Sequence, residues 1–382
     1  MRDSGSCVLD DNDLLLAITP DHSLASAMLS LGNSTTRHPT LTILPGGNGN
    51  QMHEIGDEVQ GNGEDDHTLP AVCIVGCASW DTLMPIDHYP AEGTYCIASG
   101  EIEQPGGTST NFAVALARLD APPRFVGMVG DDWRGERLRA GLAEAGVLTD
   151  TMRTRVGQES DRSIIPISPT GGRTIFWIKG AMLRRGDAVD TDLVYAHRLV
   201  YLDLVDLDLW NDLLDTYAQQ HATRPAAPPL IGQAVYVAGV LAPDAARALI
   251  RRHHVFIGGG WEWQLLTGES DDTRMIAAIQ TLTQAGGALT AAVVTRGAAG
   301  CTLITRDAVT DVPAFAVDVQ DTTGAGDAFA AGFAYGMVQG WETLRCARFA
   351  NAVGGLATRG FGAQTSLSTL SEATRLAFGG QD

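Results

Sequence analysis

The chain has 382 residues, enough for two domains or for one large domain with an appendage. Hydrophobic residues make up 45% of it and charged residues 19%, so most of the chain should fold. The 26 basic and 45 acidic residues give a formal net charge of -19, which argues against binding to nucleic acid or to anionic lipid surfaces. No run approaches the ~18 apolar residues that cross a membrane, so we expect no membrane partner.

The first 69 residues differ in composition from the rest. They hold two basic and eleven acidic residues, and the stretch 45–70 is rich in Gly, Asn, Asp and His without periodicity. We predict an acidic, disordered N-terminal extension at 1–69 and a folded domain at 70–382. The six cysteines are scattered without a CxxC pair, which is typical of a reducing compartment and favours the cytoplasm.

From residue 71 onward, apolar runs typical of buried strands alternate with segments of helical spacing. In chain order we predict a strand at 71–76, a helix at 110–119, a strand at 124–130, a helix at 134–145, a hairpin of strands at 163–167 and 174–178, and strands at 199–204, 235–238, 255–257 and 291–295. This alternation predicts an α/β fold, in which a parallel sheet carries helices on both faces. The hairpin would form a smaller β element beside it.

The strongest motif is the string Asp-Thr-Thr-Gly-Ala-Gly-Asp at 321–327, followed by an Ala/Gly-rich helix. Small residues before a helix leave backbone N–H groups unpaired at its N-terminus, where they and the helix dipole favour an anion. Asp327 falls in the first helical turn and could accept a proton from a hydroxyl. An anion hole beside a carboxylate base suits phosphoryl transfer to an alcohol. A plain helix cap is the alternative interpretation.

The string at 321–327 resembles the second signature of the ribokinase-like (PfkB) carbohydrate kinase family. A Gly-Gly turn at Gly106 and Gly107, leading to Asn111 on a helical segment, resembles the family's first signature. The likeness covers about 71–378. It implies a ribokinase-like three-layer α/β/α sandwich with a mostly parallel central sheet and a small β lid, whose strands come from about 80–105 and 160–180. It also suggests a homodimer formed through the lid.

The resemblance implies roles for residues on the acceptor side of the site. Asp327 corresponds to the family's general base, and Gly324, Ala325 and Gly326 correspond to the anion hole around the transferred phosphate. The sugar-binding positions correspond to Asp81, Gly106, Gly107 and Asn111. Glycines allow close approach of the backbone, and Asp and Asn offer short hydrogen-bonding groups suited to hydroxyls. Capping of a turn by Asp81 and of a helix by Asn111 are the structural alternatives.

The resemblance also implies a nucleotide side with ATP and Mg²⁺. Thr295, Arg296 and Gly297 correspond to a loop near the ATP phosphates and ribose, and Asn351 to the adenine pocket. Glu262 corresponds to the glutamate of an Asn-x-x-Glu motif that organises Mg²⁺ through water, although position 259 is Gly where the family has Asn. Asp321 and Thr323, with the loop 360–366, fall where many relatives bind a monovalent cation such as K⁺. The tryptophans at 261 and 263 are expected to pack rather than to stack on a base.

We therefore predict an ATP-dependent carbohydrate kinase that transfers the γ-phosphoryl group to a hydroxyl of a sugar or sugar acid, so its small-molecule partners are the sugar and ATP. Arg296 or Arg162 is a candidate for additional positive charge near the phosphates. Arg173 and Lys179, the chain's single lysine, lie in the predicted lid and either face an anionic group of the substrate or are merely solvated. The alternatives are a nucleoside kinase of the same family and a non-catalytic sugar-binding regulator on the kinase fold.

Overall fold

The structure is a computed structural model, which describes residues 69–379 except 170–171, 223–226, 235–236 and 239. The predicted N-terminal extension therefore lies, apart from Leu69, outside the described residues. None of the helices in the described part has the length and hydropathy that crossing a bilayer requires.

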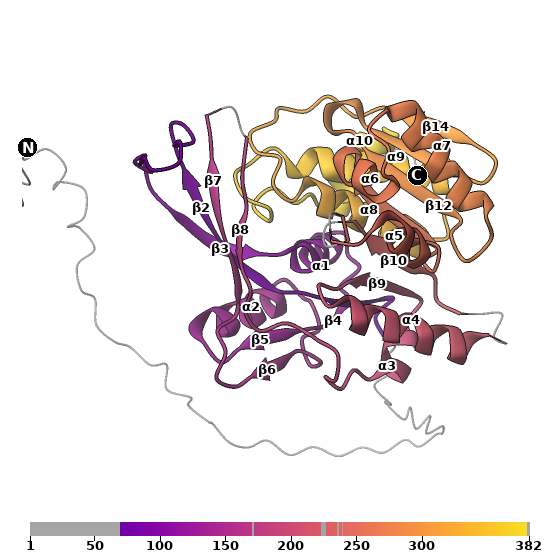
Figure 1. Ribbon diagram of the computed structural model, residues 1–382, viewed down its shortest axis with the longest axis horizontal. Helices are drawn as coiled ribbons and strands as arrows, with labels where there is room; N and C mark the ends of the chain where they lie inside the picture. Colours follow the sequence, from indigo (N-terminus) through magenta and orange to yellow (C-terminus); the bar gives the residue numbers. More distant parts are fainter. Residues whose placement is uncertain (1–68, 170–171, 223–226, 235–236, 239, 380–382) are drawn as a thin grey trace, which may run out of the picture. The chain divides into compact units, whose positions relative to one another are not determined.

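The central sheet has eight strands in the order β14-β13-β12-β11-β10-β9-β1-β4 (Figure 1). The strands from β4 to β12 pair in parallel, while β13 and β14 are antiparallel additions at one edge. Their bounds are β1 Val72–Gly76, β4 Arg124–Val126, β9 Leu199–Asp203, β10 Leu230–Gln233, β11 Val255–Gly259, β12 Ala291–Thr295, β13 Cys301–Thr305 and β14 Val309–Val312. The short apolar runs of the sequence thus form strands buried on both faces, as parallel sheets require.

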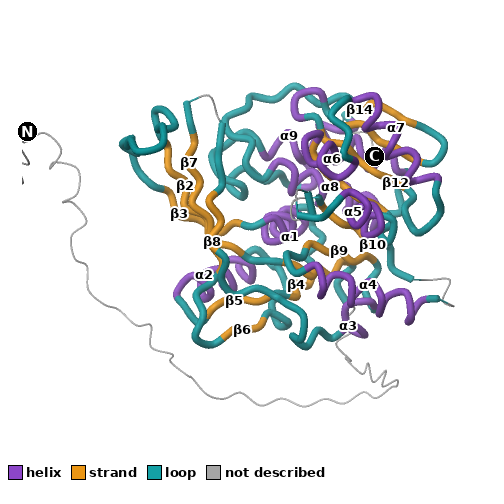
Figure 2. Tube along the Cα trace, viewed as in Figure 1, coloured by secondary structure: helices purple, strands orange, loops and turns teal. Residues whose placement is uncertain are grey.

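Helices cover both faces of this sheet and give three layers (Figure 2). Alternate side chains of β1 serve separate cores: Val72 and Ile74 face one set of helices, and Cys73 and Val75 face the other. The first set is α1 Thr108–Arg118, α2 Trp133–Glu144, α8 Ala325–Val338, α9 Thr343–Ala357 and α10 Leu370–Phe378. The second set is α3 Thr191–Tyr195, α4 Leu207–His221, α5 Pro243–Ile250, α6 Gly260–Thr267 and α7 Asp272–Gln284. The predicted three-layer α/β/α sandwich is confirmed.

Two smaller sheets stand beside the sandwich. One has the order β3-β2-β7-β8 and is built from β2 Ser79–Pro85, β3 Ile102–Gly106, β7 Asp161–Ile167 and β8 Phe176–Ile178. It projects from the edge of the sandwich (Figure 1), and we call it the lid sheet. The other pairs β5 Met128–Gly130 with β6 Arg153–Arg155. In the lid sheet, Asp81 of β2 pairs with Ser163 of β7, which brings both side chains to one face.

The Ala/Gly-rich sequence of α8 and α9 allows these two helices to pack very closely. A Cβ added at Gly332 of α8 would lie 2.9 Å from a methyl group of Val353 and 3.0 Å from the Cα of Ala350 on α9. Larger side chains at these positions would push the helices apart. The close packing fixes α8, and with it the 321–327 loop that precedes the helix.

Two predicted strands are wrong in detail. The run 124–130 forms two strands, β4 and β5, which belong to different sheets. The extended run is interrupted at Gly127, where the Phe125 ring leaves no room for a side chain, since a Cβ would lie 2.4 Å from it. Of the strand expected at 235–238, residues 235–236 lie outside the described residues and 237–238 are in a turn, while the strand in this region is β10, Leu230–Gln233. Val237 lies in a turn, where its N–H donates to the carbonyl of Ala234, and is buried there. An apolar run alone does not distinguish a buried turn from a strand.

Candidate active site

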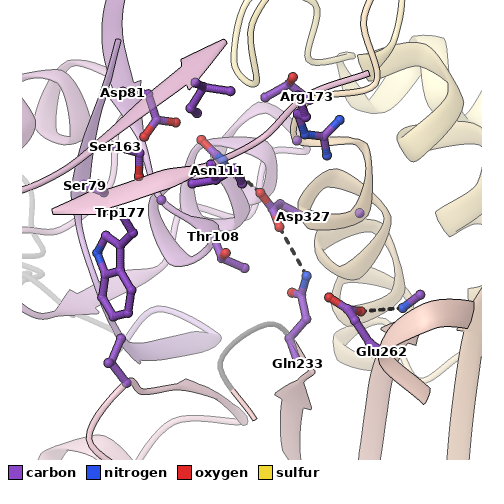
Figure 3. A pocket seen from close by; sticks show the side chains of 18 of the residues that line it. Ser79, Asp81, Thr108, Asn111, Ser163, Arg173, Trp177, Gln233, Glu262 and Asp327 are labelled. Carbon is purple, nitrogen blue, oxygen red and sulfur yellow. Dashed lines mark hydrogen bonds between the residues drawn. The ribbon is translucent and has the colours of Figure 1, made fainter. Parts of the chain in front are cut away.

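A cavity of about 610 Å³ lies where the central strands end and the lid sheet begins (Figure 3). Strands β10, β11 and β12 end at Gln233, Gly259 and Thr295, and these three residues line the cavity. From the lid sheet come Asp81, Asp161, Ser163 and Trp177, and from the start of α8 come Gly324, Gly326 and Asp327. The carboxyl ends of parallel strands are the usual ligand site of such sheets.

The 321–327 loop is held in shape by its own first carboxylate. Asp321 accepts hydrogen bonds from the N–H of Thr323 at 2.9 Å and from its hydroxyl at 2.8 Å, and also from the N–H of Gly362 at 2.8 Å. Gly324 caps α8 with φ +75°, and a Cβ there would lie 2.6 Å from that of Ala363. Gly326 is different, because a Cβ there would meet no atom within 4 Å.

The loop therefore presents backbone donors to open space. The first N–H groups of a helix have no partner within the helix, which applies to Gly326 and Asp327 in the first turn of α8. The N–H of Ala325 is already directed to the carbonyl of Thr322 at 3.3 Å. Free donors at the positive end of the helix dipole favour an anion beside Asp327.

Asp327 is partly buried, and both of its carboxylate oxygens are hydrogen-bonded. The side-chain amide of Asn111 donates to Oδ2 at 2.8 Å, and that of Gln233 donates to Oδ1 at 3.2 Å (Figure 3). Burial raises the pKa of Asp327 to about 6, although the two amides and the positive charge of Arg173 oppose this rise. A carboxyl with that pKa is mostly ionised at neutral pH and still able to take up a proton.

The predicted sugar-side residues come together at the base of the lid sheet. Asp81 is 6% exposed and lines the cavity with Gly107 and Asn111. Gly106 touches Asp81 directly, since a Cβ there would lie 2.0 Å from the Asp81 carboxylate, and Gly107 has φ +92° as the cap of α1. Burial, followed by the negative charges of Asp327 and Asp161, raises the pKa of Asp81 to about 7.

Asp161 and Trp177 of the lid sheet are cavity residues that no sequence motif marks, and they lie beside the predicted lid residue Lys179. Asp161 is 1% exposed, and its Oδ1 accepts from the indole N–H of Trp177 at 2.8 Å and from the N–H of Gly180 at 3.1 Å. Lys179 lies with its Nζ 4.8 Å from the centre of the Trp177 ring and lines the cavity. The register of β7 with β2 was the missing signal, because it alone places Asp161 beside the sugar-side residues.

Arg173 crosses from the lid to the 321–327 loop. Its guanidinium donates to the hydroxyl of Thr322 at 3.1 Å, and the side chain lines the cavity. The two arginines named as sources of positive charge lie elsewhere. Arg296 pairs with Asp272 at 2.8 Å, and Arg162 alternates along β7 with the cavity-facing Asp161 and so points to the other face of the lid sheet. Arg173 therefore supplies the cation that faces Asp327.

Glu262 lies on the cavity wall opposite the lid, 7% exposed, where its Oε2 accepts from the N–H of Gly259 at 2.5 Å (Figure 3). Burial raises its pKa to about 7. The two tryptophans beside Glu262 behave differently. Trp263 is fully buried and donates to the carbonyl of Val293 at 2.9 Å, as expected for a packing residue, whereas Trp261 is 60% exposed and lines the cavity.

The predicted nucleotide-side residues are spread more widely. Thr295 lines the cavity, while Arg296, Gly297 and Asn351 do not. Gly297 has φ +54° and opens a 3₁₀ turn, Gly297–Ala299. Asn351 is 7% exposed on α9 and donates to the carbonyls of Val312 at 2.9 Å and Pro313 at 3.2 Å, so its amide fixes the end of β14.

Comparison with known proteins identifies a family and several relatives. A family model described as pfkB family carbohydrate kinase matches residues 77–370. The chain is 28% identical over 312 residues to the ribokinase of Bacillus subtilis strain 168, with 80% of this chain and 98% of that protein covered. It is 28% identical over 305 residues to an ATP-dependent ribose-1-phosphate kinase of Halopiger xanaduensis, covering 77% and 94%. The structure of Arabidopsis thaliana ribokinase complexed with ribose and ATP matches with TM-score 0.68 and 24% identity, covering 81% of this chain and 99% of that one.

Proposed function

This chain belongs to the pfkB family of carbohydrate kinases and is an ATP-dependent phosphotransferase with an alcohol group as acceptor, and we propose that Asp327 is the base that activates the acceptor hydroxyl. The observation that carries the proposal is the meeting of Asp327, the Gly326 anion site and Asp81 in one cavity. The acceptor is a sugar whose hydroxyls bind Asp81, and its primary hydroxyl lies toward Asp327.

In this mechanism, Asp327 removes the proton from the acceptor hydroxyl as the oxygen attacks the γ-phosphorus of ATP, and the bond from the γ-phosphorus to the bridging oxygen breaks to release ADP. The N–H groups of Gly326 and Asp327 at the start of α8 stabilise the charge that develops on the phosphoryl oxygens. Arg173 adds a positive charge from the lid, because it already contacts Thr322 of the same loop. Closure of the lid sheet over the cavity excludes water and limits hydrolysis of ATP.

Mg²⁺ would be held by the ATP phosphates and, through water, by Glu262, as would suit a cation that keeps several of its waters. The donor set fits this arrangement: Glu262 faces the cavity, and among the described residues no three His, Cys, Asp or Glu side chains gather to hold a metal by themselves. When bound, the ion neutralises phosphate charge. Asp321 and Thr323, with the loop 360–366, would frame K⁺, and exchange of K⁺ for tetramethylammonium should then slow turnover.

We place the nucleotide beyond the anion site, toward Thr295 and the turn at Arg296 and Gly297, with adenine near Asn351. Thr295 supports this placement because it lines the cavity at the end of β12. The contacts of Arg296 and Asn351 give these residues a structural part as well, in which they hold the strands that border the nucleotide.

The acceptor we favour is a pentose, since the relatives that cover most of this chain include ribokinases. A phosphorylated pentose is a second candidate, favoured by the two lid cations, Arg173 and Lys179, that line the cavity. The ribose-1-phosphate kinase among the relatives has the corresponding chemistry. A nucleoside is a third acceptor to be tested, as its ribose would occupy the same place.

A coupled assay of ADP release tests the proposal. Purified enzyme receives Mg-ATP and K⁺ with pentoses, hexoses, ribose 1-phosphate, sugar acids and nucleosides in turn. We expect release that depends on one class of acceptor, and we expect Asp327→Asn to lower kcat by about a hundredfold or more with its melting temperature unchanged. Near-normal kcat in Asp327→Asn would remove Asp327 from the role of base.

We propose further that two copies pair through the outer face of the lid sheet. Phe176 and Ile178 of β8 are 57% and 37% exposed on the face opposite Trp177, and Phe176 pairs with Ile164 of β7. Light scattering should report a dimer for the wild type and a monomer for Phe176→Lys. Val156→Lys, which changes an 84% exposed apolar residue outside the lid, is the matched control and should stay dimeric.

A further inference from the structure

Two further hydrogen bonds, one buried and one partly buried, set the orientation of the amides that hold Asp327. On one side, the Tyr201 hydroxyl donates to Oε1 of Gln233 at 2.7 Å, and the Nε2 of Gln233 donates to Asp327. On the other side, the Nε2 of Gln364 donates to Oδ1 of Asn111 at 3.0 Å, and the Nδ2 of Asn111 donates to Asp327. Each amide that faces the carboxylate therefore has its own oxygen held by an outer donor.

The outer donor matters because a primary amide can rotate. Its oxygen and its NH₂ group have nearly the same size, so packing alone does not choose between them. If Gln233 turned over, its oxygen would face the carboxylate oxygen of Asp327 and repel it. A phenol can donate a hydrogen bond from only one site, and that donor is satisfied only when Oε1 of Gln233 faces Tyr201.

Tyr201 is well suited to this task because it is fixed and always protonated. It is fully buried on β9, and its ring stacks on that of Phe112 with the centres 4.0 Å apart. Burial holds the pKa of its hydroxyl far above the usual range. Phe112 lies in the middle of α1, next to Asn111. The stacked pair of Tyr201 and Phe112 therefore supports both amides, that of Gln233 through Tyr201 and that of Asn111 through α1.

We propose that Gln233 and Tyr201 are positioning residues for the reaction, which orient Asp327 and stabilise its carboxylate without touching the substrate hydroxyl. Gln364 serves Asn111 in the same way. This inference rests on the proposed role of Asp327 as base. Neither Gln233 nor Tyr201 belongs to the glycine-rich signatures, and the two lie 32 residues apart, on neighbouring strands of the central sheet.

Other charged groups also act on Asp327, and the test must separate them. Asp81 faces it from the lid sheet, Asp203 from β9 and Glu262 from α6, while Arg173 faces it from the lid with the opposite charge. None of these four is changed by a substitution at Gln233. A difference in pH dependence between a Gln233 variant and the wild type therefore reports the lost amide contact.

The experiment measures kcat and KM against pH for the full chain and for three variants. Gln233→Met removes the amide, and Tyr201→Phe removes only the hydroxyl. The double variant removes both partners of the Tyr201–Gln233 hydrogen bond, so neither of these two groups is left unpaired. Loss of a donor to a carboxylate raises its pKa, so the acid limb of kcat should move up by about one pH unit in Gln233→Met. The shift should be smaller in Tyr201→Phe, and KM for both substrates should stay near the wild-type value.

The control is Tyr195→Phe, in which another buried tyrosine loses a hydrogen bond to the carbonyl of Leu213 on the other face of the sheet. Its pH profile should match that of the wild type. An unchanged acid limb in Gln233→Met and in the double variant, with Asp327→Asn inactive, would overturn this inference and leave Asp327 as base. Full activity of Asp327→Asn would overturn the proposed base first.

Discussion

At the scale of single residues, the site places opposite charges close to the position where phosphate would be transferred. Arg173 reaches from the lid to Thr322, and its charge acts on Asp327. Lys179 lies on the Trp177 ring, and its charge acts on Asp161. Burial raises the pKa of Asp161 to about 6, and the charge of Lys179 opposes this rise. The two lid cations thus face different parts of one cavity and should have separable effects.

Arg173→Gln should lower kcat about tenfold or more for every acceptor, because a charged donor near the transferred phosphoryl group is lost. Lys179→Gln should leave kcat for a neutral pentose nearly unchanged and should raise KM only for an acceptor that carries a phosphate. Steady-state kinetics with both acceptor types distinguish these effects. A rise in KM for the phosphorylated acceptor alone in Arg173→Gln would instead place this arginine at the substrate's own anion.

At the scale of elements, the start of α8 combines two glycines with different physical requirements. Gly324 needs its glycine because φ is +75° and the Ala363 backbone and side chain lie against it. Gly326 has an ordinary φ and free space around it. The fold therefore requires glycine at position 324. Any requirement for glycine at position 326 comes from the ligand that occupies the free space beside it.

We expect Gly324→Ala to destabilise the protein by about 1–3 kcal/mol, since both the backbone conformation and the contact with Ala363 are strained. Gly326→Ala should keep the melting temperature of the wild type and should weaken use of ATP, because the added methyl group lies beside the free N–H groups. Thermal melts and KM for ATP measure the two effects. Equal melting temperatures for both variants would contradict this division.

At the scale of the whole molecule, the cavity brings together several carboxyls that burial makes hard to ionise. The pKa is raised to about 7 for Asp81 and Glu262 and to about 8 for Asp203, which is fully buried on β9. In the unfolded chain such groups ionise near pH 4. Between about pH 4 and pH 8 the folded state therefore binds more protons than the unfolded chain does. The free energy of unfolding should therefore fall as pH rises through 7 and 8.

Buried histidines act in the opposite direction, but only at lower pH. Burial lowers the pKa of His197, His253 and His254, so their cost to the folded state disappears once an unfolded histidine becomes neutral, above about pH 6.5. Melting temperatures of the ligand-free protein measured from pH 7 to 9 should therefore decrease. Asp203→Asn, which keeps an acceptor for the hydroxyl of Ser109, should show a smaller decrease; a melting temperature that rises over this range would refute the prediction.

The sequence by itself determined the order of the elements and the chemistry of the loops. Alternating apolar runs and helical segments predict a parallel sheet with two helical layers, and the string at 321–327 predicts an anion site and a carboxylate base from local backbone physics alone. Such features depend on neighbours within a few residues, which is why they can be predicted without the fold.

Only the tertiary structure decided which side chains meet at Asp327. Asn111 and Gln233 reach Asp327 across 216 and 94 residues, and Gln364 reaches Asn111 across 253. The position of Asp161 depends on the register between β2 and β7, and that of Arg173 on its contact with Thr322. The exposure of Trp261 depends on which other elements pack against α6. Contacts at this separation follow from strand order and helix packing, which one sequence does not specify, because an amide or an arginine has no local pattern that marks its distant partner.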